Sequence, residues 1–120
     1  MNKYRDKSDF EINKEVVKLI KTKGGYSCVD YDEIVKVYVS QNTGIYKEFD
    51  PCNDPYDAMP IIMDNKITVM YDSIGNTWCA HAGSVMDDCG WDYKITPAHY
   101  ADSDNYYRAA MEVFLMMKNG

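Results

Sequence analysis

The sequence predicts an α+β fold in which helices at both ends of a 120-residue chain pack on a small, mainly antiparallel sheet. Two observations indicate this class. Apolar residues recur at helical spacing near both termini, whereas the middle of the chain alternates between apolar and polar residues and contains several turn signals. We expect residues 1–120 to form a single domain, because this length can bury one core and no linker divides it.

A helix over residues 105–117 is predicted to be the element on which the rest of the chain packs. Its side chains at helical spacing form a wide apolar face, made of Tyr106, Ala109, Ala110, Val113, Phe114, Met116 and Met117. Ser103, Asp104 and Asn105 precede the helix and offer oxygens that can cap its first turn. Lys118 follows it, where a cation is favourable.

A second helix is predicted to begin after Ser8, because Ser8 and Glu11 match a capping box. Its apolar stripe consists of Ile12, Val16, Leu19 and Ile20. Gly24 and Gly25 permit the left-handed turn that ends it.

The segment between these helices is expected to contain the strands. The ranges expected to be extended are 26–29, 34–39, 45–49, 66–71 and 78–82. The first two are compatible with two strands or with one bent strand. Residues 74–77 resemble a hairpin turn, which makes the last two ranges an antiparallel pair.

Two segments are less regular. Residues 49–62 contain three prolines and form a rigid elbow, in which Asn53 or Asp54 caps a short helical turn that begins at Pro55 and Pro60 forces a break. Residues 83–104 lose any period and are expected to be an irregular insert, interrupted at most by a short strand at 93–95.

Composition excludes several classes of function. A net charge of −6 and a pI near 4.7 argue against binding of duplex nucleic acid, which requires clustered cations. No apolar run is long enough to span a membrane and no export signal is present, so we expect a cytoplasmic protein whose four cysteines remain reduced.

Neither a metal site nor catalysis is favoured by the sequence. Cys79, His81, Cys89 and His99 are suitable metal ligands, but they lack the closely spaced pairs of a zinc site. Cys79, His81 and Asp87 form a nucleophile, base and acid only if loops happen to bring them together. We therefore expect no metal, no cofactor and no enzyme activity.

Arg108 is the most informative charged residue, because a guanidinium in the first turn of a helix adds a cation to free backbone amides. It also opposes the helix dipole and therefore requires an anion nearby. Two interpretations remain open. The anion is a carboxylate of the proline elbow (Asp50, Asp54 or Asp57), or it is the phosphate of an external ligand.

The ligand-binding interpretation adds polar and aromatic groups to Arg108. Asn53 and Asp57 would recognise polar edges of a ligand, and aromatic rings would stack on a base. The candidate site consists of Asn53, Tyr56, Asp57, Trp78, Trp91, Tyr107 and Arg108. We expect it to lie at the interface of a homo-oligomer.

Three segments, SDFEINK at 8–14, FDPCNDPYDAMPII at 49–62 and RAAMEVFLMM at 108–117, resemble the phage NinX-like family in order and spacing. The resemblance implies an α-β-α sandwich-like domain and a phage or prophage accessory protein. Since phage accessory genes often counter host defence, the leading hypothesis is sequestration of a small nucleotide immune signal, such as a cyclic ADP-ribose isomer or a cyclic oligonucleotide. The alternatives are direct inhibition of a host defence protein by the acidic, aromatic insert, and a structural or regulatory phage role.

Overall fold

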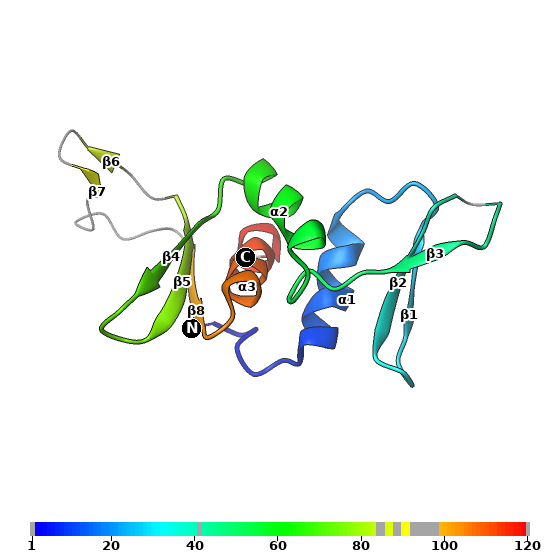
Figure 1. Cartoon of the computed structure of the whole chain (residues 1–120), viewed down its shortest axis with the longest axis horizontal. Helices are drawn as coiled ribbons and strands as arrows, with labels where there is room; N and C mark the ends of the chain where they lie inside the picture. Colours follow the sequence, from blue (N-terminus) through cyan, green and yellow to red (C-terminus); the bar gives the residue numbers. More distant parts are fainter. Residues whose placement is uncertain (1, 41, 84–85, 88–89, 92–98, 120) are drawn as a thin grey trace.

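Three helices lie between two small antiparallel sheets in the computed structural model, which describes residues 2–40, 42–83, 86–87, 90–91 and 99–119 (Figure 1). The helices in this part of the chain are α1 (Asp9–Leu19), α2 (Pro55–Asp64) and α3 (Tyr106–Asn119). The strands are β1 (Tyr26–Val29), β2 (Ile34–Tyr38), β3 (Tyr46–Glu48), β4 (Thr68–Asp72), β5 (Thr77–Ala82), β6 (Met86–Asp87), β7 (Gly90–Trp91) and β8 (His99–Ser103). The predicted α+β class is confirmed.

The main strands form two sheets where the sequence analysis expected one. β2 is the central strand of the order β1-β2-β3, and β5 is the central strand of β4-β5-β8. Among the described residues, β6 pairs with β7. The predicted hairpin at residues 74–77 is confirmed, because Tyr71 pairs with Trp78 and Asp72 with Thr77. Asp72 closes the turn by accepting the backbone N–H groups of Ile74 and Gly75.

The layer order differs from the α-β-α sandwich that the resemblance implied. The helices lie between the two sheets, with α3 against β5 and β8 and with α1 against β2 (Figure 1). The reason lies in α3, in which every residue from Arg108 to Leu115 is buried. A helix that is apolar on nearly all sides must be covered on all sides. The stripe predicted for it was therefore too narrow, since Met111 and Leu115 are fully buried as well.

The start of α1 was predicted correctly from the residues around it in the sequence. The Ser8 side chain accepts the N–H of Glu11, and Glu11 reaches back to Ser8, so the predicted capping box is confirmed. The buried residues of α1 face α3 and β2 in one continuous core.

The elbow is more helical than expected. Asp54 caps α2 and Pro55 occupies its first turn, as predicted, but Pro60 lies inside the helix rather than breaking it. Proline removes the backbone donor at its own position and the helix continues with that hydrogen bond missing. Burial of Ile61 and Ile62 in the core compensates for this loss.

The region from 83 to 104 is not wholly irregular. Its last part forms β8, which pairs with β5 from Trp78 opposite Ser103 to Ala82 opposite His99. The sequence of β8 is polar and only Ala101 is buried, so its alternation is too weak to predict a strand without knowledge of its partner. The short strand predicted at 93–95 lies outside the described residues.

Candidate functional site

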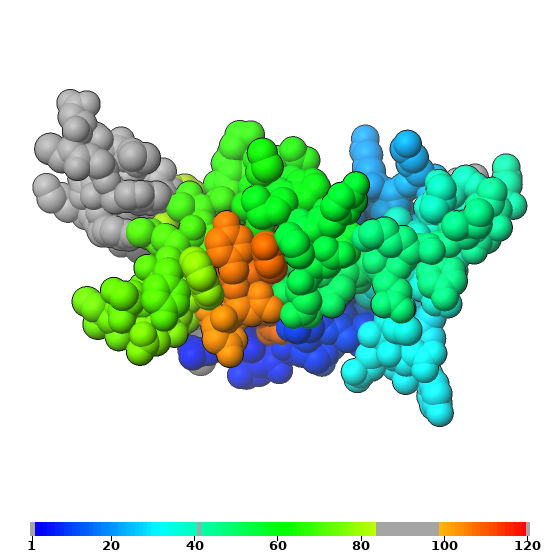
Figure 2. Space-filling view, viewed as in Figure 1, coloured from blue at the N-terminus to red at the C-terminus, as the bar shows by residue number. Residues whose placement is uncertain are grey.

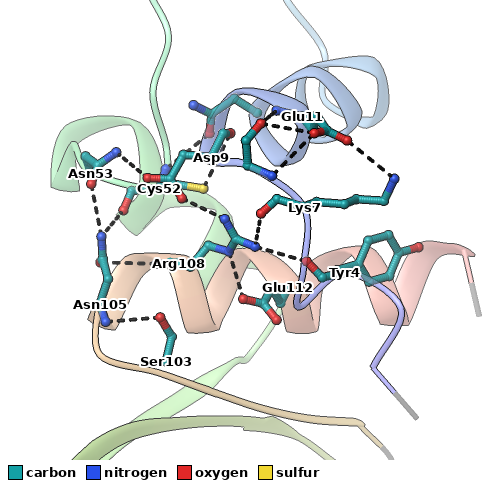
Figure 3. Close-up of polar contacts among 12 residues, drawn as sticks. Tyr4, Lys7, Asp9, Glu11, Cys52, Asn53, Ser103, Asn105, Arg108 and Glu112 are labelled. Atoms are coloured by element: carbon teal, nitrogen blue, oxygen red, sulfur yellow. Dashed lines mark hydrogen bonds and ion pairs between the residues drawn. The ribbon is translucent and has the colours of Figure 1, made fainter.

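Arg108 lies in the first turn of α3 and its guanidinium points into the protein (Figure 3). Its side chain is 10% exposed; Nε donates to Glu112 Oε2 at 2.8 Å and Nη1 donates to Asp9 Oδ1 at 2.7 Å. Nη2 donates to the carbonyl oxygens of Tyr4 at 3.0 Å and Lys7 at 2.6 Å, with a longer contact to Arg5 at 3.4 Å. One side chain therefore connects α3, the start of α1 and the N-terminal segment.

The anions beside Arg108 are not those of the elbow, so that part of the prediction is wrong. Each elbow carboxylate has another partner among the described residues: Asp50 accepts from Asn13, Asp54 caps α2, and Asp57 binds Lys47. Glu112 was detectable from sequence because it lies four residues after Arg108, on the same helical face. Asp9 was not, because it is 99 residues away in the chain.

Two asparagines extend this cluster. Asn105 caps α3, since its Oδ1 accepts the N–H groups of Tyr107 at 2.9 Å and Arg108 at 3.3 Å. Its Nδ2 donates to Asn53 Oδ1 at 3.0 Å, and Asn53 Nδ2 in turn donates to Asp9 Oδ2 at 3.1 Å. The structure thus brings the predicted pair Asn53 and Arg108 onto the same carboxylate. We call Asp9, Asn53, Asn105, Arg108 and Glu112 the polar cluster.

The polar cluster is electrostatically well satisfied. Burial alone would lower the pKa of Arg108, but the hydrogen bonds that the guanidinium donates to Glu112 and Asp9 outweigh this effect, and the pKa is raised above its usual value. Of the five N–H donors of the guanidinium, the contacts with described residues leave one hydrogen on Nη1. A cavity of about 410 Å³ lies alongside, but four carboxylates and three cations line it. This arrangement supports a structural clamp rather than a phosphate site.

Tyr56 and Asp57 lie at a different place, in a groove of about 600 Å³ between the segment that follows α1, strands β2 and β3, and α2. We call it the α1–α2 groove. Its apolar walls include Val37, Phe49, Pro60 and Ile61. Its charged lining consists of Lys21, Lys23, Lys47, Asp57 and Asp64. Cations outnumber carboxylates here, in contrast with the net charge of −6 for the whole chain.

Lys47 and Asp57 form an ion pair at one wall of this groove. The Asp57 side chain is 6% exposed and its Oδ2 also accepts the backbone N–H of Asp50 at 3.0 Å, so the carboxylate is fixed. The Lys47 side chain is 50% exposed, and its ammonium lies 5.9 Å from the centre of the Tyr56 ring. Asp57 thereby holds a half-exposed cation beside an exposed aromatic ring.

Comparison with known protein families shows the family to which the chain is related. The family model described as Bacteriophage P22, NinX matches residues 3–118. The chain belongs to this family. The NinX match agrees with the predicted resemblance, extends it over nearly the whole chain and supports a phage protein. No curated protein and no solved structure matches the chain.

Two of the remaining predicted residues of this NinX chain, Trp78 and Tyr107, belong to a row of aromatic side chains. Trp78 lies in a row of edge-to-face rings from Tyr71 through Trp78 and Tyr106 to Tyr107, with centroids 5.0, 5.2 and 5.0 Å apart. This row packs β5 against the start of α3. For Trp91 the structure describes only a place in β7.

Cys79 and His81 lie on the face of β5 opposite Trp78 and Ala80, since side chains alternate along a strand. The Cys79 thiol and the Tyr100 hydroxyl are 3.4 Å apart, and the Tyr100 ring stacks on His81 at 6.3 Å. Burial lowers the pKa of His81. Within the described residues no group of three His, Cys, Asp or Glu side chains is arranged to hold a metal; Cys89 lies outside them. No helix among the same residues is long and apolar enough to span a membrane.

Proposed function

We propose that this phage protein works by binding rather than by catalysis, and that the α1–α2 groove captures a small anionic ligand with an aromatic ring, of the nucleotide class. The observation that carries the proposal is the combination of an apolar cavity of about 600 Å³ with a cationic rim. Ligand sites are commonly of this size, and are mostly apolar with a few placed polar groups.

The groove offers a place for each part of such a ligand. The Tyr56 ring is 81% exposed and can stack on a base, a contact that contributes about 1 to 3 kcal/mol in nucleic-acid binders. Lys47 donates to Asp57 and to the Glu48 carbonyl, so one of its three ammonium hydrogens remains for a phosphate oxygen. Lys21 and Lys23 are exposed and supply further cations at the same rim.

The polar cluster has a different role in this proposal. Arg108 and Asn53 fix the start of α3 against α1 and the elbow, and the elbow contains the start of α2. They therefore support the groove without touching the ligand. In this proposal the lysines of the α1–α2 groove, and not Arg108, contact the phosphate of the ligand.

Because the chain belongs to a phage family, we propose that its ligand is a nucleotide signal made by the host for defence. Capture of such a signal, for example a cyclic ADP-ribose isomer or a cyclic oligonucleotide, would counter that defence. Titration calorimetry against a panel of such molecules tests this. We expect at least one to bind, and expect Lys47→Ala or Tyr56→Ala to weaken binding about tenfold or more. Lys18→Ala removes an exposed lysine of α1 outside the groove and should bind like the parent chain. Absence of heat with every member of the panel would refute the proposal.

A second candidate is direct binding of a host protein. It is favoured by exposed apolar side chains, of which Val39 and Tyr56 line the groove and Leu19, Ile45 and Met63 are further examples. Large exposed apolar patches commonly mark protein contacts. Deleting residues 86–96 tests the version of this candidate that relies on the insert, because this deletion retains β8 and its pairing with β5. Loss of anti-defence activity on deletion, with the activity of Lys47→Ala unchanged, would favour protein inhibition over capture of a nucleotide.

A further inference from the structure

We propose that the edge strand β1 pairs with β1 of a second copy of this chain, joining two β1–β2–β3 sheets into one continuous antiparallel sheet. In the described part of the chain, β1 pairs with β2 alone, and the sheet forms one end of the molecule (Figures 1 and 2). This inference does not require the proposed ligand, although Lys21 and Lys23 have a role in both proposals.

The backbone of β1 presents unpaired groups on its open side. The N–H of Tyr38 donates to the Gly25 carbonyl, and the register continues with Tyr26 opposite Val37 and Cys28 opposite Val35. Because hydrogen-bonded and non-hydrogen-bonded pairs alternate in an antiparallel ladder, Tyr26 and Cys28 direct their N–H and C=O groups away from β2.

The two edge strands of this sheet, β1 and β3, differ in how well they are protected from pairing with another strand. Exposed edges are normally protected from pairing by charged side chains, proline or a bulge. β3 carries Lys47 and Glu48 among its three residues, whereas β1 has the sequence YSCV with neither charge nor proline. β1 is therefore the edge suited to pairing.

Charges at the two ends of β1 select a second copy as the partner. Lys21 and Lys23 precede the strand, while Asp32 and Glu33 follow it, and all four are exposed. Antiparallel pairing about a two-fold axis places the basic end of one copy along the acidic end of the other, and it does so twice. With the axis at Ser27, Tyr26 of each copy pairs with Cys28 of the other through about four backbone hydrogen bonds.

Two matched substitutions test the interface by light scattering after size exclusion. We expect the parent chain to be a dimer and Tyr26→Pro to be a monomer, because proline removes an N–H that faces the open edge. Tyr46→Pro makes the same change on β3, where the alternation set by the Val39 to Ile45 hydrogen bond also directs the N–H outward, and should remain dimeric. A monomeric parent chain, or a dimeric Tyr26→Pro, would overturn the proposal.

Charge reversal provides a test that does not depend on proline. Lys23→Glu and Asp32→Lys should each raise the dimer dissociation constant about tenfold, and the double variant should restore it. If the double variant remains as weak as the single ones, or if neither single change affects dimerisation, pairing through β1 is excluded.

Discussion

Arg108 Nε and Glu112 Oε2 are 2.8 Å apart, and both side chains are buried within a single turn of α3. A buried ion pair contributes little by itself, because desolvation offsets much of the attraction between its charges. Removing one partner is costly, since the other charge is left in the interior. The two residues therefore affect stability mainly through their dependence on each other.

Replacing Arg108 tests this dependence. Arg108→Ala should lower the free energy of unfolding by about 3 to 5 kcal/mol, because Glu112 keeps a side chain that is 3% exposed and loses its cation. The double variant Arg108→Met with Glu112→Leu should be more stable than Arg108→Ala, since neither charge remains buried. Urea denaturation measures both changes. If Arg108→Ala unfolds at the same urea concentration as the parent chain, the clamp is not structural.

The two carboxylates beside Arg108 should contribute unequally. The Asp9 side chain is 44% exposed, so solvent screens its pairing with Arg108 and Asp9→Asn should cost about 1 kcal/mol or less. Glu112→Gln should cost more, because Glu112 also accepts from Asn2 at 2.6 Å and is almost fully buried. Thermal unfolding of the two variants at equal concentration makes the comparison. Equal losses would show that exposure does not determine the effect here.

Local chemistry explains which parts of this fold were predictable. The start of α1 follows from Ser8 and Glu11, and the start of α2 from Asp54 and Pro55, because capping depends on residues within one turn. β8 was missed because its place depends on β5, about twenty residues away, and not on its own alternation.

The site was predictable only in part, for the same reason. Arg108 was identified as special from its position in a helix, but its partners Asp9 and Tyr4 come from the far end of the chain. The α1–α2 groove has walls from separate elements, so Tyr56 could be proposed as a ligand contact while Lys21 and Lys47 could not be placed beside it.

His81 should make stability depend on pH. Burial lowers its pKa in the folded state below the usual value of about 6.5, so the unfolded chain takes up a proton first as the pH falls. The stabilisation from neutral His81 is therefore present above pH of about 6.5 and is lost as the pH falls toward the folded pKa. Urea denaturation from pH 7.5 to 5.5 should show this loss in the parent chain and a weaker pH dependence in His81→Gln. An unchanged slope in His81→Gln would contradict the assignment.

Cys28 and Cys52 should differ strongly in thiol reactivity. Cys52 has no exposed surface, and burial, followed by the nearby Asp9 carboxylate, raises the pKa of its thiol. Since the thiolate is the reactive form, Cys52 should resist alkylation by iodoacetamide in the native protein and react only in denaturant. Cys28 is partly exposed on β1 and should react under native conditions. Peptide mass spectrometry after timed labelling distinguishes the two sites.

Arg108→Ala should accelerate labelling of Cys52 through more frequent opening of the polar cluster, whose Asn105 donates to the Cys52 carbonyl at 2.8 Å. Native labelling of Cys52 as rapid as that of Cys28 would show that the elbow and α3 separate readily, contrary to a clamp formed by Arg108.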